Sequence, residues 1–380
     1  GGTMSLNKYG SGTLTMGGNH TFTGATTIQG GTIKAGALAT TGGASSLGNA
    51  TSAVTLGGTL GKGTLVYMGN SATFTRGFTI GTGGGQLDST ISGQTLTLGT
   101  GNISAGGPLT LGGSGDIQIN SVVSGSGSVT KTGAGRLTIN NNQTFTGALA
   151  INEGTVKMMS GRLFATNTNV SIAANAAWLL DGSSQTVNSL TGLGTISEES
   201  ATAATDILTV GNGGASFTFA GTLAGGNATV AGKRAIALTK AGAGTMTLTG
   251  ENTNTGTTTI SAGVLQVGAG GSIGTLGTGA VVNNAGLVFN RSDSGYTSYV
   301  VPNTISGTGT LTKSGAGLIT LTGTNSWSGS TTISSGTLQV GAGGSTGTLG
   351  SGAVANNATL IFTRGDSSYI APNAISRAGP

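Results

Sequence analysis

One unit recurs four times along the chain, and its fixed internal spacing limits the fold more than any other feature of the sequence. Each copy is anchored at a lysine, and these are Lys8, Lys131, Lys240 and Lys313. Apolar residues follow every anchor lysine by six and by eight positions, a spacing of two that is typical of a β-strand. Copies of one small unit are expected to stack in one dimension rather than to surround a single compact core.

The second half of each copy keeps the same phase. An isoleucine follows the anchor lysine by twenty residues and a glycine follows it by twenty-three, so each unit holds short strands separated by glycine turns. We expect the isoleucines to be buried at equivalent corners of the core; they are Ile28, Ile151, Ile260 and Ile333. The threonines between the two apolar residues of the first strand should face outward and be exposed; they are Thr15, Thr138, Thr247 and Thr320.

Composition excludes most helical folds. The 380 residues include 76 glycines, and each interior glycine costs an α-helix about 1 kcal/mol relative to alanine. Strands without helices between them can pair in parallel if the chain winds into a coil, with each strand bonded to the coils above and below. We therefore predict an all-β fold, a parallel β-helix or β-solenoid with glycine-rich turns and short lateral loops, continuous over residues 1–380. Its repeat units are anchored near 8–36, 131–157, 240–312 and 313–380, with roughly 20 to 25 residues in each coil.

The last two copies differ in length at one place. Leu265 recurs as Leu338 at an offset of 73 residues, whereas Pro302 recurs as Pro372 at an offset of 70. The change falls in the segment that begins at Arg291 in one copy and at Arg364 in the next, and a change in length marks a loop. We expect this segment to leave the coil as a lateral excursion.

The excursion contains the only candidate adhesion motif. Arg364, Gly365 and Asp366 spell a tripeptide that integrins bind, and a lateral loop would expose it. The same place in the preceding copy has the sequence Arg291, Ser292 and Asp293, so one substitution within a shared repeat also explains the motif.

The residues of the fourth copy resemble a known family. Lys313-Ser314-Gly315-Ala316-Gly317, Ile319-Thr320-Leu321-Thr322-Gly323 and Trp327 to Ile333 are similar to the autotransporter-associated β-strand repeat, also called the passenger-associated transport repeat. The other three copies match it in the same phase. The resemblance implies a right-handed parallel β-helix in a large bacterial surface or secreted protein, often a type V secretion passenger. It also implies a scaffold, since the family repeat carries no catalytic residues.

The side chains that carry catalysis are scarce. There is no cysteine, and the single histidine, His20, is replaced in the other copies by Gln143, Asn252 and Asn325, which we interpret as a polar turn column. The ten acidic residues are dispersed, and the adjoining pair Glu198 and Glu199 should be a solvated turn, because neighbours on a strand point to opposite faces. We expect no catalytic, cofactor or metal site. The alternative is a polysaccharide-active lyase or hydrolase whose acids meet on adjacent coils.

An aromatic column follows the same repeat. Phe22, Phe145 and Trp327 share one position, with Asn254 in the third copy. We expect these side chains to pack at a corner of the coil rather than to stack against sugars.

The distribution of charge and of apolar residues argues against nucleic acid as a partner and against a membrane span. The 15 basic residues are scattered, with Lys233 and Arg234 as the tightest pair, so we expect no nucleic acid. The longest nearly apolar stretch, Ala173 to Leu180, is too short to span a membrane. The chain begins without a signal-peptide pattern and stops partway through a repeat, so we expect a longer or processed protein.

These observations predict a structural or adhesive extracellular fibre segment, secreted or held at the bacterial surface. Unfinished repeats at both ends and few repelling charges predict self-association, first end to end and then laterally, and a filament subunit. Surface glycans and host proteins are the other expected partners.

Overall fold

In the computed structural model, the chain is an all-β solenoid of about 16 turns, which confirms the predicted fold class. The structure describes residues 3–39, 43, 45–200, 204–225, 235–293, 298–366 and 369–377. Every regular element of these residues is a short β-strand. The chain divides into two compact units, Gly1–Ser183 and Ser184–Pro380.

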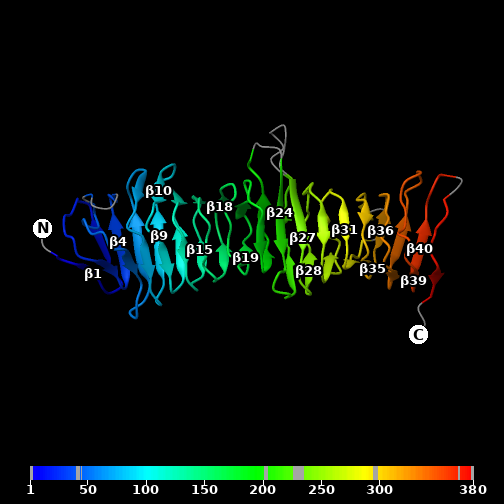
Figure 1. Ribbon diagram of the computed structural model, residues 1–380, viewed down its shortest axis with the longest axis horizontal. Helices are drawn as coiled ribbons and strands as arrows, with labels where there is room; N and C mark the ends of the chain where they lie inside the picture. The colour runs from blue at the N-terminus through cyan, green and yellow to red at the C-terminus, as the bar shows by residue number, and fades with distance from the viewer. Residues whose placement is uncertain are drawn as a thin grey trace. The chain divides into compact units, whose positions relative to one another are not determined.

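Three parallel sheets form the first unit, and in Figure 1 its strands lie side by side as the rungs coloured from blue to green. One sheet has the order β1 (Leu6–Lys8), β3 (Thr26–Ile28), β5 (Val54–Leu56), β8 (Phe78–Ile80), β11 (Ile103–Ala105) and β14 (Val123–Ser124). The second has the order β2 (Thr13–Met16), β4 (Gly31–Ala35), β6 (Gly63–Tyr67), β9 (Gly85–Ser89), β12 (Leu109–Gly112), β15 (Val129–Lys131), β17 (Leu149–Ile151) and β19 (Asn169–Ile172). The third has the order β7 (Ala72–Phe74), β10 (Thr95–Leu98), β13 (Asp116–Ile119), β16 (Arg136–Ile139), β18 (Thr155–Met158) and β20 (Ala177–Leu179).

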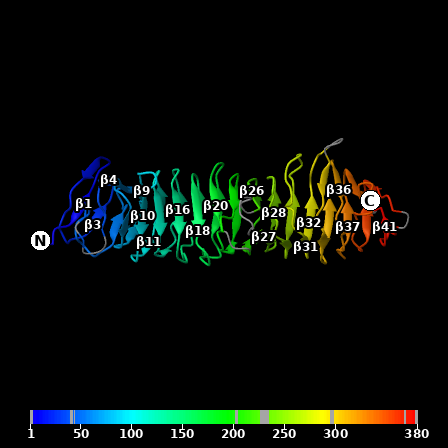
Figure 2. The same ribbon diagram turned by 90° about the horizontal axis from the view of Figure 1, so that it is seen from above.

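The second unit repeats this construction, and Figure 2 shows its strands from above, coloured from green to red. One parallel sheet has the order β21 (Gln185–Val187), β24 (Thr205–Val210), β27 (Ala235–Lys240), β29 (Thr258–Ile260), β31 (Val281–Asn283) and β34 (Ile305–Ser306). The next has the order β22 (Ser189–Gly192), β25 (Phe217–Phe219), β28 (Thr245–Leu248), β30 (Val264–Val267), β32 (Gly286–Phe289), β35 (Thr310–Lys313), β37 (Thr331–Ile333), β39 (Val354–Asn356) and β41 (Ile375–Ser376). The remaining strands pair as β23 (Thr195–Ser197) with β26 (Thr222–Leu223), and in the order β33 (Tyr299–Val301), β36 (Leu318–Leu321), β38 (Thr337–Val340) and β40 (Thr359–Phe362).

The register of the strands gives the length of each coil. Gly63 pairs with Gly85 and Gly85 with Leu109, so these coils contain 22 and 24 residues, within the expected range. Several coils are longer; for example, Gly31 pairs with Gly63 after 32 residues, and Thr205 pairs with Ala235 after 30. The paired strands keep their register in both cases, so the extra residues enter between strands.

Apolar side chains alternate inward along each strand and stack from coil to coil. Strand β6 shows the pattern, since Gly63, Leu65 and Tyr67 are buried and the two residues between them are half-buried. The four repeat isoleucines are completely buried, and each is the register partner of the anchor lysine one coil earlier; the pairs are Lys8 with Ile28, Lys131 with Ile151, Lys240 with Ile260 and Lys313 with Ile333.

The prediction for the outward threonines holds only for Thr15, which is exposed. Thr138 and Thr247 are half-buried, and the prediction is wrong for Thr320, which is 2% exposed. Thr320 lies between its register partners Val300 and Gln339 on the neighbouring coils. Outward side chains only about 4.8 Å apart along a solenoid cover one another, so facing outward does not ensure exposure.

Within the part of the chain that the structure describes, no helix has the length and apolar character needed to cross a membrane.

Candidate functional site

The anchor lysines point into the core and bind backbone carbonyls. The ammonium group of Lys131 donates to the carbonyl oxygens of Thr132 at 2.7 Å and Gly133 at 2.6 Å in its own turn, and to that of Glu153 on the next coil at 3.3 Å. Lys240 makes the same three bonds to Ala241, Gly242 and Ala262, at 2.5, 2.8 and 3.2 Å. Each ammonium thus joins two successive coils.

Full hydrogen bonding explains how a lysine can be buried here. Lys240 and Lys313 are completely buried, and a buried ammonium is tolerated only when its donors are satisfied. Burial lowers the pKa of Lys131 to about 8, against the opposing pull of the Glu153 and Asp116 carboxylates. Burial also lowers the pKa of Lys240 and of Lys313. The sequence marked these lysines as anchors without giving them a role.

The glycine twenty-three residues after each lysine belongs to the same clamp. Gly154 has a φ of 66°, a left-handed conformation that glycine adopts without strain. A Cβ at Gly154 would lie 2.6 Å from the Gly133 carbonyl oxygen and 3.0 Å from the Lys131 ammonium nitrogen. Glycine is therefore required by the backbone conformation and by the close approach of the lysine.

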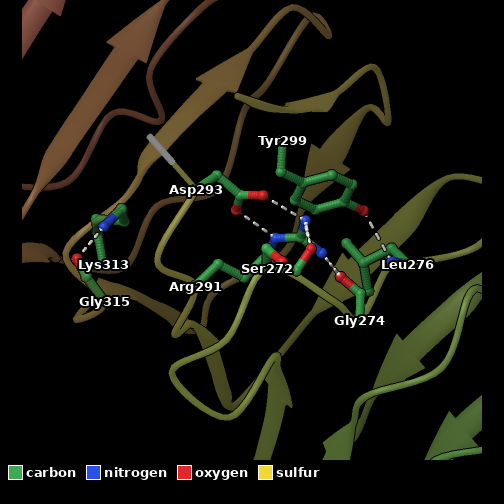
Figure 3. Close-up of polar contacts among 8 residues, drawn as sticks. All are labelled: Ser272, Gly274, Leu276, Arg291, Asp293, Tyr299, Lys313 and Gly315. Carbon is green, nitrogen blue, oxygen red and sulfur yellow. Dashed lines mark hydrogen bonds and ion pairs between the residues drawn. The ribbon is translucent and has the colours of Figure 1, made fainter. Parts of the chain in front are cut away.

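A second cluster closes the lateral excursion (Figure 3). The Arg291 guanidinium donates two hydrogen bonds to the Asp293 carboxylate, at 2.7 and 2.8 Å, and two more to the carbonyl oxygens of Ser272 and Gly274. The guanidinium carbon lies 4.5 Å from the centre of the Tyr299 ring, and the Tyr299 hydroxyl accepts a 2.8 Å bond from the Leu276 backbone. We call these contacts the arginine clasp; they tie the 268–276 turn to residues 291–293 and to Tyr299.

The candidate adhesion motif is the next copy of the arginine clasp. Arg364 donates to both oxygens of Asp366, at 2.8 and 2.6 Å, and also to the carbonyl oxygens of Ser345 and Gly347. Its guanidinium carbon lies 4.2 Å from the centre of the Tyr369 ring. The hydrogen bond from Arg364 holds the pKa of the Asp366 carboxyl below its usual value. The two charged side chains of the tripeptide thus bind each other, with the Arg364 side chain 9% exposed and that of Asp366 26% exposed.

In the polar column that contains His20, the amide side chains of the other copies bond to the backbone of neighbouring coils. Asn325 accepts a 2.8 Å bond from the Ile305 backbone on the preceding coil and donates a 2.7 Å bond to the Thr348 carbonyl on the following one. Asn252 makes the equivalent bonds to Leu223 and Thr275, and Gln143 accepts from Val123. His20 itself is half-buried, and its backbone pairs with that of Ser45.

The aromatic column also lies at a corner. Phe145, Trp327 and Asn254 are buried, Phe22 is half-buried, and the Trp327 indole donates to the Thr331 hydroxyl at 3.3 Å. These side chains pack inside the coil.

The adjoining acids point to opposite faces. Glu199 is exposed, but Glu198 is 3% exposed, which differs from the expected solvated turn. Glu198 is two positions after the inward residue Ile196, so the strand alternation continues past the end of β23 and turns its side chain inward. No group of three metal-ligating side chains of the His, Cys, Asp or Glu type occurs among the described residues. Lys233 and Arg234, the tightest pair of basic residues, lie outside the described residues.

Comparison with known proteins agrees with this geometry. The family model of the passenger-associated-transport-repeat matches residues 6–35, 129–158, 238–267 and 311–340, and each matched segment contains one anchor lysine with its isoleucine and glycine. The chain thus carries four copies of the passenger-associated-transport-repeat. This repeat protein is similar to the adhesin BmaC autotransporter of Brucella suis biovar 1 (strain 1330), with 32% identity over 385 residues that cover 93% of the chain. The chain spans 10% of that relative's length. No solved structure matches the repeat protein.

Proposed function

We propose that the chain is a structural and adhesive shaft segment of an autotransporter passenger, located outside the cell or at its surface, without catalytic activity. The observation that carries the proposal is that polar groups recurring in phase with the repeat bind the backbone of neighbouring coils; these groups are the anchor lysines, the corner amides and the arginine clasps. Such contacts stiffen a stack. The similarity to an autotransporter named as an adhesin supports the adhesive part.

Surface display tests the adhesive role. Non-adherent bacteria that display residues 1–380 should bind an extracellular matrix or epithelial surface more strongly than bacteria displaying an unrelated solenoid of similar length. Equal adherence across a panel of matrix proteins, glycans and cells would remove adhesion from the proposal and leave a structural spacer.

An enzymatic function is tested separately. The purified chain should show no turnover of acidic or neutral polysaccharides or of peptide substrates. Reproducible hydrolysis or elimination that disappears when one Asp or Glu is replaced would establish the alternative, a polysaccharide-active enzyme.

The arginine clasp predicts that the Arg364-Gly365-Asp366 tripeptide acts in folding rather than as an integrin ligand. Integrin binding needs both charged side chains free to face the receptor, whereas these two are bonded to each other. Cells should spread equally on the wild-type chain and on the Gly365→Ser variant, which has the sequence of the preceding copy. Spreading that requires Gly365 and is blocked by a soluble peptide of the same sequence would refute this assignment.

Self-association forms part of the proposal. In the first unit, Thr27, Thr55, Thr79 and Ser104 form an outward hydroxyl column on successive coils, and such ladders can pack side by side as in polar zippers. Sedimentation velocity should show concentration-dependent assembly that the Thr79→Lys variant weakens. A monodisperse monomer at high concentration would argue against assembly.

A further inference from the structure

The turn that follows the anchor lysine has the same geometry in the first and second copies. Gly10 has a φ of 67° and Gly133 a φ of 69°. Lys8 donates to the carbonyl oxygens of Tyr9, Gly10 and Gly30 at 2.7, 2.8 and 3.3 Å, which reproduces the bonds of Lys131. The two turns therefore direct the amide of the positive-φ glycine in the same way.

In the second copy, this amide binds a carboxylate. The Gly133 backbone N–H donates a 2.8 Å hydrogen bond to Oε2 of Glu153 on the next coil. The negative charge of the Glu153 carboxylate also stabilises the Lys131 ammonium, since it raises the pKa of Lys131 against the effect of burial. A glycine turn beside a lysine ammonium is thus an anion site that the protein fills with its own side chain.

In the first copy, the side chain that would fill the site is missing. The residue equivalent to Glu153 is Gly30, whereas the third and fourth copies have Ala262 and Ser335. No hydrogen bond to the Gly10 N–H occurs within the described residues. A cavity of about 430 Å³ opens there, lined by Gly10, Ser11, Gly30, Gly31, Leu60 and Lys62.

We propose that this cavity binds the carboxylate of an acidic sugar, with the carboxylate on the Gly10 N–H where the Glu153 carboxylate lies on Gly133. The exposed Lys62 adds an ammonium at the cavity wall, and the charge of Lys8 lies beneath the turn. Leu60 at the wall is 64% exposed and Tyr9 next to Gly10 is 54% exposed, so apolar surface is available for the face of a sugar ring. The Ser11 hydroxyl can bond to a ring hydroxyl.

The cavity has room for a side chain at Gly30, which allows the proposal to be tested by substitution. A Cβ at Gly30 would lie 3.8 Å from the Gly10 nitrogen and no closer than 3.6 Å to any other atom, and Gly30 does not have a left-handed φ. Gly30→Glu should therefore fold and place a carboxylate over Gly10, as Glu153 does over Gly133. Gly30→Ala is the matched control, because it adds the Cβ without the charge.

The experiment is a calorimetric titration of the full chain with tetragalacturonate. We expect saturable binding, at least tenfold weaker binding to the neutral methyl ester, at least tenfold loss in Gly30→Glu and in Lys62→Met, and less than threefold change in Gly30→Ala. Absence of binding, equal affinity for the ester, or full affinity in Gly30→Glu would overturn the proposal. Tighter binding of a tetraglutamate peptide would also overturn it, since the site would then recognise acidic protein segments.

This site stands apart from the proposed shaft function. If the chain binds the sugar but does not promote adherence, the sugar site stands and the adhesive role is refuted. If the chain promotes adherence but does not bind the sugar, the adhesive role stands and the sugar site is refuted.

Discussion

Burial of a lysine in the apolar column of a solenoid is unfavourable unless the N–H donors of its ammonium group are hydrogen-bonded. Lys131, Lys240 and Lys313 are nearly or completely buried, their stems stack on Ile151, Ile260 and Ile333, and their ammonium groups bind turn carbonyls. The acceptors come from two coils, so the lysine bonds form only when the second coil lies in the correct register on the first.

Replacing Lys131 by Met tests the clamp. The substitution keeps an unbranched stem but leaves three carbonyl groups without their donor, and we expect a loss of about 2 kcal/mol in the free energy of unfolding. Lys34→Met is the control, because Lys34 lies on the outward face of β4; it should change stability by less than about 0.5 kcal/mol. Chemical denaturation monitored by circular dichroism gives both values. Equal effects of the two substitutions would contradict the clamp.

The lowered pKa of Lys131 predicts a pH dependence with a definite sign. Its pKa is about 8 in the folded chain and takes its ordinary value of 10.5 in the unfolded chain. Between these values the unfolded chain binds more protons, so this residue makes the free energy of unfolding rise with pH. Denaturation between pH 8 and 9.5 should show a steeper positive slope for the wild type than for Lys131→Met. An identical slope in the two proteins would show that Lys131 keeps an ordinary pKa.

At the level of single residues, the sequence predicted the phase of the repeat but not the contacts that its side chains make. The phase of Lys131, Ile151 and Gly154 was visible in the sequence, but the lysine acceptors are backbone carbonyls, which leave no side-chain signature. Thr320 was expected to be exposed because alternation gives the direction of a side chain but not the cover that adjacent coils provide. The Arg364-Gly365-Asp366 tripeptide was expected to be exposed because it falls in the predicted loop, and the sequence does not show that its two charged side chains bond to each other.

At the scale of strands and turns, the glycines after the lysines allow the close approach of successive coils. Gly263 has a φ of 66°, and a Cβ there would lie 2.4 Å from the Gly244 carbonyl oxygen. Gly263→Ala should cost about 1 to 2 kcal/mol from the left-handed backbone alone, with the steric clash adding to this loss. Gly271→Ala is the control, since nothing lies within 4 Å of its Cβ. Thermal unfolding should separate the two variants by several degrees; coincident transitions would contradict the close-approach argument.

The lateral excursion shows how far an element could be predicted. The three-residue difference between the copies is the sequence signal from which we predict a loop at this place. The contacts of Arg291 could not be predicted from the sequence, because the arginine clasp joins it to carbonyls of the 268–276 turn, and only the fold brings these segments together. The aromatic partner, Tyr299, lies at the start of β33 and is separated from Arg291 by residues that the length change affects.

At the scale of the molecule, the coil architecture followed from periodicity, since spacing of two within strands and of about twenty between them permits few folds. We predict that the two compact units form one continuous solenoid. With about 16 turns at roughly 4.8 Å per coil, the rod would be roughly 75 Å long. A stiff shaft requires such continuity.

Electron microscopy of the purified full chain tests this account most directly. Particles should be single straight rods of roughly 75 Å, or linear assemblies of that unit, with one uniform width along their length. A population of two lobes joined at variable angles, or of compact particles without a long axis, would contradict the stiff continuous shaft on which the proposed function rests.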